Sequence, residues 1–308
     1  MEWIVARWIT FVAILLATGA CAVGVAVLPR TSVDSTTRQS IGREAARVGI
    51  GAALALIPAS LLRLADQLLA LRVEGQPMLE GFLPLLTATT WGVGFLWQFA
   101  ATCLAVFGFW QASRAPEAAT HWIVATIAAV GLCATPALQG HAIGSEEFTV
   151  LATASDILHV TGAGLWLGGV GVIGWLGVAL PDADGIVLPA KAATADARLR
   201  VLVPLIPPVA LPGAALLFAS GVATSVLHLR EPFDLWSAEW GRYVLVKFIL
   251  FTFIVGLGAA NWRCLGPRIK SASGVSELRR SLVIEVVIAL LVLIVTALLV
   301  VTPLPGET

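Results

Sequence analysis

The sequence predicts an all-α polytopic membrane protein with eight transmembrane helices and both termini on the outer side of the membrane. The first observation is the composition: of 308 residues, 58% are hydrophobic and only 12% are charged. Soluble domains have about 25% charged residues. The second is a mean hydropathy of +0.91, more apolar surface than a soluble enzyme could bury. The third is that the apolar residues form long continuous runs without strand-like alternation.

Eight apolar runs are long enough to cross a bilayer, whose hydrocarbon core is about 30 Å thick and requires about 20 helical residues. They are residues 3–28, 48–71, 82–111, 121–138, 151–180, 201–227, 243–262 and 282–301. The first run is too long for a signal-peptide core and lacks a clear cleavage site, so we interpret it as a retained span. Prolines in the second and sixth runs predict kinks there. We therefore expect one membrane domain over residues 1–308.

The basic residues predict the orientation of these spans. Of the 19 Lys and Arg residues, thirteen lie in the first, third, fifth and seventh loops, whereas four lie at the N-terminus or in the other loops. Arg63 and Lys247 fall inside apolar runs. Because cytoplasmic loops carry the excess of basic residues, the odd-numbered loops are predicted to be cytoplasmic. An even number of spans then places both termini outside.

Several function classes lack their sequence signals. The formal net charge is zero and no basic cluster is present, which argues against nucleic acid as a partner. The four cysteines contain no C-x-x-C pair, so neither a disulfide framework nor a zinc knuckle is expected. No phosphate-binding G-x-x-x-x-G-K-[ST] motif is present, so the chain has no visible drive by ATP. We expect a protein that is not an enzyme and that has the lipid bilayer as its main solvent.

The fifth run contains an acid and an imidazole one helical turn apart, Asp156 and His159. Residues three apart share a helix face. Ionisable side chains are costly inside a membrane and usually face a site or a partner, so function should be sought here first. A glycine series follows in the same run, comprising Gly162, Gly164, Gly168 and Gly169. Gly164 and Gly168 form a small-xxx-small pair, which predicts that another helix approaches closely and comes up to His159.

The histidines extend this candidate site. In the predicted topology His141, His159 and His228 all fall in the outer half of the membrane, on three consecutive spans, and only His121 lies on the inner side. Imidazole suits copper, zinc, iron and nickel. We therefore predict a metal site formed by His141, His159 and Asp156, with His228 as a possible further nitrogen. Asp156 would be a ligand or would orient the imidazole ring.

Purely structural roles remain open for the same residues. His159 could make a structural polar contact inside the bundle, and His228 could cap a span at the interface. The chain has only two methionines, so a thioether-lined copper path is not available, and Cys133 is the one thiol close enough to consider. Lys247 and Glu285 also lie in apolar runs, and we expect both to snorkel towards the nearest interface.

Three stretches carry a resemblance to a known family. They are residues 140–142 with 156–159 and 165–169, residues 240–247 with 259–263 and 267–268, and residues 278–285 with 302–303. In these stretches the chain resembles the copper resistance protein D family of bacterial inner-membrane proteins. The resemblance covers spans four to eight, residues 119–303. Spans one to three, residues 1–112, match only in hydropathy and in residues 89–92.

The resemblance implies that copper is moved or handled across the inner membrane and taken from the periplasmic side. It also implies a separate periplasmic copper-binding protein as partner. A rival hypothesis is a membrane cytochrome, in which His159 with His228 or His141 would ligate b-type haem. A third is a structural subunit of a larger membrane complex. An absorption spectrum and the effect of His159→Ala distinguish these hypotheses.

Overall fold

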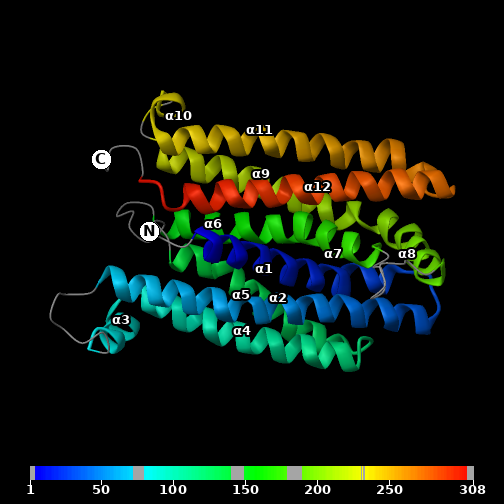
Figure 1. The fold of residues 1–308 in the computed structure, drawn as a ribbon, viewed down its shortest axis with the longest axis horizontal. Coiled ribbons are helices and arrows are strands. Elements are labelled where there is room, and N and C mark those ends of the chain that lie inside the picture. The colour runs from blue at the N-terminus through cyan, green and yellow to red at the C-terminus, as the bar shows by residue number, and fades with distance from the viewer. Residues whose placement is uncertain are drawn as a thin grey trace.

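The structure, a computed structural model, describes residues 4–71, 80–139, 149–178, 189–229, 231 and 233–303. All regular secondary structure in these ranges is helical. Figure 1 shows the helices lying side by side along the long axis of the molecule. Eight helical segments in the described part are long and apolar enough to cross a membrane, which confirms the eight spans predicted from hydropathy.

The first four spans are formed as follows. The first is α1 (Ile4–Ala22), continued by η1 (Val23–Val27) and η2 (Leu28–Arg30), and the second is α2 (Ser35–Ala70). The short α3 (Phe82–Ala88) precedes the third span, α4 (Thr90–Arg114), and α5 (Ala119–Leu138) is the fourth. Asp34 caps α2 by accepting a hydrogen bond from the Thr37 backbone N–H at 2.8 Å, and this bond holds the pKa of its carboxyl below the usual value.

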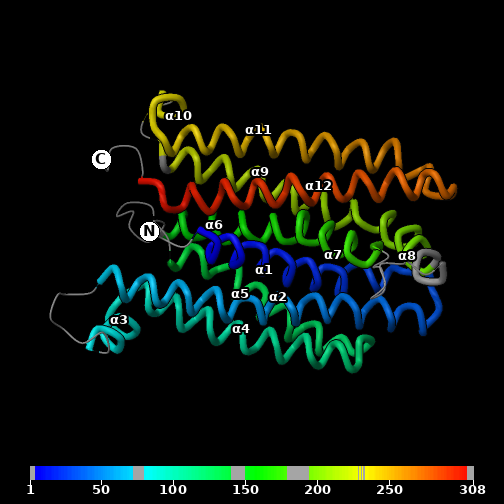
Figure 2. Tube along the Cα trace, in the orientation of Figure 1, coloured from blue at the N-terminus to red at the C-terminus, as the bar shows by residue number. Residues whose placement is uncertain are grey.

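The last four spans complete the bundle. The fifth consists of α6 (Thr149–Ala163), the π-helical η4 (Gly164–Gly168) and α7 (Gly169–Leu176), which continue one another as a single rod (Figure 2). After α8 (Pro189–Leu202) and η5 (Val203–Leu205), α9 (Pro207–His228) is the sixth. The short α10 (Asp234–Ser237) leads into α11 (Glu239–Ala260), extended by the π-helical η6 (Asn261–Leu265) and by η7 (Gly266–Arg268). The eighth is α12 (Ala272–Leu299).

The structure differs from the predicted elements at three places. The run 82–111 is broken at Thr89, which is extended (φ −119°, ψ 148°) and caps α4 by accepting from the Gly92 N–H. Part of the polar connector between the fifth and sixth runs forms α8. The second span begins at Ser35, well before the apolar run, so that three basic residues of the first loop lie on its opening turns: Arg38, Arg43 and Arg47.

Both ends of the chain lie at the same end of the bundle, as an even number of spans requires. Figure 1 shows the start of α1 and the end of α12 there, together with α3 and α10, whereas α8 lies at the opposite end. We call these the terminal end and the far end. At the far end Arg279 pairs with Asp196 and donates from Nε to the Gly177 carbonyl at 3.1 Å, which ties α12 to α8 and α7.

Helix α1 packs directly on the glycine series of the fifth span. A side chain at Gly168 would overlap the Leu15 carbonyl, and one at Gly164 would meet the Thr18 side chain. The backbones of Gly19 and Gly168 lie in direct contact. This confirms that the Gly164/Gly168 pair admits a close helix, and it identifies that helix as α1. On the other face of α6, Gly162 packs on Gly213 and Leu217 of α9, which brings α9 up to His159.

Candidate functional site

A cavity of about 640 Å³ occupies the space where the fifth span faces α9, α11 and α12, and the first half of α1 also lines it. Leu229, Leu235 and Trp240 line it at the terminal end. Trp166 and Phe251, whose ring centroids lie 5.7 Å apart in an edge-to-face contact, line its deepest part. We call these two rings the aromatic floor. Most of the remaining lining is aliphatic, so the few polar side chains in the cavity define its chemistry.

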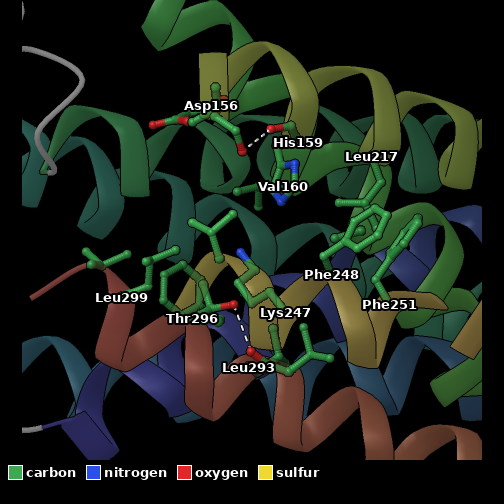
Figure 3. A pocket seen from close by; sticks show the side chains of 18 of the residues that line it. Asp156, His159, Val160, Leu217, Lys247, Phe248, Phe251, Leu293, Thr296 and Leu299 are labelled. Carbon is green, nitrogen blue, oxygen red and sulfur yellow. Dashed lines mark hydrogen bonds between the residues drawn. The ribbon is translucent and has the colours of Figure 1, made fainter. Parts of the chain in front are cut away.

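Asp156 and His159 both line this cavity from one face of α6, as their spacing predicted. Figure 3 shows the two side chains on one wall, with Lys247 entering from the opposite side. Both residues are half-buried. The acid and the imidazole therefore lie on one wall of the same cavity, and their role as metal ligands stays a prediction.

Small hydroxyl residues of α9 hold the two side chains in place. Thr224 Oγ1 donates to Asp156 Oδ1 at 3.3 Å, and Ser220 Oγ lies 3.3 Å from His159 Nδ1. Ser155 Oγ of α6 donates to the Ser220 carbonyl at 3.0 Å, which adds a second bond between the same two helices. Two helices thus fix both groups with side chains that lose little rotamer entropy when they are ordered.

The hydrogen bonds assign the tautomer of His159. Ser220 Oγ donates its one proton to the Leu216 carbonyl at 2.6 Å, so towards the ring it acts as an acceptor. We therefore assign the ring proton to Nδ1, which donates to Ser220 Oγ. This leaves Nε2 as the atom with a free lone pair. A neutral imidazole whose other nitrogen is held by a hydrogen bond is the form that binds metal ions.

Lys247 is a member of the site that the sequence interpretation missed. We expected it to snorkel to the interface, but its side chain lines the cavity, is half-buried, and interacts electrostatically with Asp156 and His159. In Figure 3 its amino group points into the cavity. The opposite charge of Asp156 explains why this ammonium group stays inside the bundle instead of reaching for the interface. Arg7 and Arg63 also line the cavity.

The other two predicted ligands are His141 and His228. His141 lies outside the described residues. His228 is the last residue of α9, and its backbone position follows from the α6–α9 pairing, in which Thr224 opposes Asp156 and Gly221 contacts His159. His228 is seven residues beyond Gly221, about 10 Å nearer the terminal end. The described part of the chain contains no group of three or more His, Cys, Asp and Glu side chains that could hold a metal ion.

The thiol considered from the sequence does not belong to the cavity. Cys133 is fully buried in the α1–α5 contact, and its Sγ lies 3.3 Å from Thr18 Oγ1. It is not among the residues that line the cavity. Sequence reasoning overlooked Ser220 and Thr224, whose hydroxyl groups hydrogen-bond the two site side chains. Their i, i+4 spacing on an apolar span was the signal that could have identified them.

Comparison with known proteins gives three findings. Residues 1–150 match the family model described as the copper resistance protein D-like N-terminal domain, and residues 207–299 match the model of copper resistance protein D. A protein of Bacillus subtilis (strain 168) named copper transport protein CutJ is 30% identical over 188 residues, which is 61% of this chain and 32% of that protein. The chain thus aligns with about a third of the length of this relative. No solved structure matches the chain.

Proposed function

Because the chain belongs to the copper resistance protein D family, we propose that this multi-pass membrane protein moves or handles copper in the bacterial inner membrane. The observation that carries the proposal is the cavity in which His159 Nε2 and the Asp156 carboxylate face the same space. An imidazole nitrogen and a carboxylate are copper ligands that a chain with two methionines has available. Copper here is the substrate, received through the cavity and passed on.

In this proposal copper enters from the terminal end, which faces the periplasm. The charge distribution of the loops supports that orientation. The cavity extends to Leu229 and Leu235 at the same end, where its mouth would lie. His141 and His228 would receive the ion first, and His159 with Asp156 would hold it deeper. A separate periplasmic copper-binding protein would deliver the ion to this mouth.

Lys247 gives the site a means of release. While copper is absent, its ammonium group neutralises Asp156. A copper ion bound by His159 and Asp156 would replace that charge and repel Lys247. The site therefore holds one cation at a time, which keeps the binding weak enough for the ion to leave again. Transport requires such reversible binding, as in other membrane pathways where ions must both enter and leave.

The central experiment is a titration of the purified protein with Cu(I) in competition with a chelator of known affinity. His159→Ala should weaken copper binding by more than about 10-fold, because it removes a ligand and not merely a supporting group. The matched control is His121→Ala, since His121 lies near the far end, away from the cavity, and its Nδ1 lies 3.4 Å from the Ala115 carbonyl. Equal affinities of the two variants would contradict the proposal and would favour a structural subunit. Protein level must be equal in both samples.

An absorption spectrum of the same samples tests the haem alternative. A b-type cytochrome would show a Soret band that His159→Ala abolishes, whereas a copper carrier is colourless in the Cu(I) state. The orientation is tested by reporter fusions after Thr308 and within residues 183–197. The two fusions should report opposite sides of the membrane, with the C-terminal one in the periplasm. Reports from the same side would refute the eight-span arrangement.

A further inference from the structure

A second polar site lies beyond the aromatic floor, at the carboxyl of Glu285 in the middle of α12. This side chain is 2% exposed, and among the described residues it is the only Asp or Glu that is buried. The expectation that it snorkels to the interface is wrong. Thirteen helical residues separate it from the start of α12, about 20 Å, which is farther than a Glu side chain can reach.

One amide is the polar partner of this carboxyl. Asn261, 7% exposed at the start of η6, donates from Nδ2 to Glu285 Oε2 at 2.9 Å. The two remaining oxygen atoms, Glu285 Oε1 and Asn261 Oδ1, are buried and have no hydrogen-bond partner. Buried polar atoms without a partner are rare and call for an explanation. Here both unpaired atoms are acceptors, so the pair lacks a donor.

A single proton on Glu285 Oε1 would supply the missing hydrogen-bond donor. An amide that donates to Oε2 through the Nδ2 hydrogen on the side of its own carbonyl brings Oδ1 towards Oε1. If Oε1 carries a proton, it becomes a donor and Asn261 Oδ1 becomes its acceptor, so that the acid and the amide close a ring of two hydrogen bonds. Every polar atom of the pair is then satisfied. An ionised carboxylate at this place would be an uncompensated charge in an apolar interior, which proteins avoid.

The surroundings contain nothing else that would neutralise Glu285. Besides burial, the one group that acts on its carboxyl is Asn261, and no charged side chain of α1, α7, α11 or α12 in the described residues does so. The carboxyl lies over Gly258 of α11, where an added Cβ would be 3.6 Å from Oε1. Two oxygens are too few for a calcium or magnesium ion, which takes six or more. No imidazole or thiol joins them to suit copper.

Trp166, one ring of the aromatic floor, lies next to both the cavity and this pair. The same added Cβ at Gly258 would lie 3.9 Å from Trp166 Cζ2, so the edge of the Trp166 ring is a neighbour of the carboxyl. Trp166 and Asn261 both lie in π-helical segments, η4 and η6. Such segments are uncommon and occur frequently at functional sites, because the extra residue loosens the local hydrogen bonding. Trp166 therefore lies next to the carboxyl and also lines the cavity, so a proton leaving Glu285 for the cavity would pass this ring.

We propose that Glu285 and Asn261 form a proton-binding site that is loaded in this conformation and exchanges its proton with the cavity past Trp166. In the release step the Oε1–H bond breaks, the electron pair remains on the carboxylate, and the proton goes to water in the cavity. The consequence that copper movement is coupled to proton movement rests on the proposed function. The proton site itself does not, because its test requires no copper.

The test is infrared spectroscopy of the purified protein in lipid at neutral pH. A protonated carboxyl gives a C=O stretching band separate from that of a carboxylate, and the band shifts to lower frequency in D₂O. Glu285→Gln should remove one such band entirely. The control is Glu277→Gln on the same helix, whose side chain is 54% exposed and which should leave the band in place. A wild-type spectrum without the band, or a band that survives Glu285→Gln, would overturn the proposal.

Two further variants keep the test informative if Glu285→Gln does not fold. Asn261→Ala leaves the acid in place but removes its hydrogen bond, so the band should persist at a higher frequency. An unchanged frequency would overturn the assigned pairing. Trp166→Leu should make the band exchange faster in D₂O than in wild type, whereas Trp175→Leu, at a 53% exposed position on α7, should not. Equal exchange rates in both variants would overturn the route past Trp166.

The link to copper is tested separately in vesicles that contain a pH-sensitive dye. Cu(I) added to wild-type vesicles should produce a pH change that Glu285→Gln abolishes. Copper uptake without a pH change in wild type would overturn the coupling while leaving the proton site intact. Loss of copper binding in His159→Ala reports on the proposed function alone, because the acid band of Glu285 should be unaffected by that variant.

Discussion

The two sides of the fifth span differ in how densely neighbouring helices pack against them. Towards α1 the contact is dense: 78% of the apolar stretch of the first span is buried, and glycine backbones lie against one another. Towards α11 and α12 the packing is loose, because the cavity lies between these helices and the fifth span; the apolar stretches of the two spans are only 6% and 22% buried in the bundle. The polar groups Asp156 and His159 lie on the loose side of a rod whose other side is fixed.

The side of the fifth span that faces α1 holds the helix in place, and the opposite side gives access to Asp156 and His159. Small residues give van der Waals contact over a long seam, which is how helices associate in lipid where no hydrophobic driving force acts between them. The seam holds the fifth span against α1, and α9 is held against α6 by Gly162 and by hydrogen bonds, so α11 and α12 are the elements whose contacts with the fifth span are interrupted by the cavity. Binding groups placed on a fixed element keep their geometry, and mobile neighbours can open and close the route to them.

Breaking the dense seam should have the largest effect. Gly168→Val would drive a branched side chain into the Leu15 carbonyl, and overpacking of this kind costs about 3 kcal/mol of unfolding free energy. A thermal melt in detergent and the accumulated level measure it. Gly169→Val is the matched control, because a Cβ there meets nothing within 4 Å. Indistinguishable melts of the two variants would mean that the seam does not determine stability.

On the loose side the strongest effect is expected from Asp156→Asn. The change removes the charge that faces Lys247 and one candidate ligand, so Cu(I) affinity should fall by about 10- to 100-fold. The melting temperature should also fall, because the ammonium group of Lys247 loses the opposite charge of Asp156. Adding Lys247→Met should restore the melt but not the affinity. If affinity is unchanged while the melt falls, Asp156 is a partner of Lys247 and not part of the metal site.

A smaller effect is expected at the residue that orients the imidazole. Ser220→Ala removes the acceptor of the His159 Nδ1 proton and should weaken Cu(I) binding by up to about 10-fold. Ser225→Ala, one turn farther along α9, removes a hydroxyl that bonds only the Gly221 carbonyl, and it serves as control. The same titration reports both variants. A loss as large in Ser225→Ala would place the effect in α9 packing and not in the orientation of the ring.

The smallest effect on binding is expected on the dense side. Cys133→Ala removes a buried thiol that touches Thr18 but not the cavity. Its cost should be about 1 kcal/mol of unfolding free energy, with Cu(I) affinity as in wild type. A clear fall in affinity would show that the thiol takes part in handling copper and that the functional division between the two sides is wrong.

The hydropathy of the chain was sufficient to predict the eight spans, because crossing a bilayer imposes a length and a composition on each helix separately. Breaks within an apolar run and helices in the connectors were harder to predict. Thr89 ends α3 and caps α4 within one apolar run, so the hydropathy profile shows no gap there. The helix α8 has a polar sequence and lies outside the apolar runs, so hydropathy alone predicted a loop.

The part of the site that lies on one helix could be predicted from the sequence, whereas the part contributed by neighbouring helices could not. Asp156 and His159 share a face by helical periodicity, which requires no knowledge of other helices. The partners Ser220, Thr224 and Lys247 depend on which helices are neighbours, and a single sequence without repeats does not contain that information. Glu285 was misjudged because its run appeared to begin close by, at residue 282, whereas the helix begins at Ala272.

The aromatic floor also has an electrical consequence. Water entering the cavity from the terminal end would carry the outside potential down to Trp166, so the transmembrane voltage would fall across the thinner layer beyond it. Moving one elementary charge through a drop of 100 mV is worth about 2.3 kcal/mol. A cation held at Asp156 would then feel little of the voltage, while a proton moving between Glu285 and the cavity would cross the first part of that layer. We expect copper affinity to be insensitive to an applied voltage and proton exchange at Glu285 to respond to it; equal responses in vesicles with an imposed potassium gradient would contradict this.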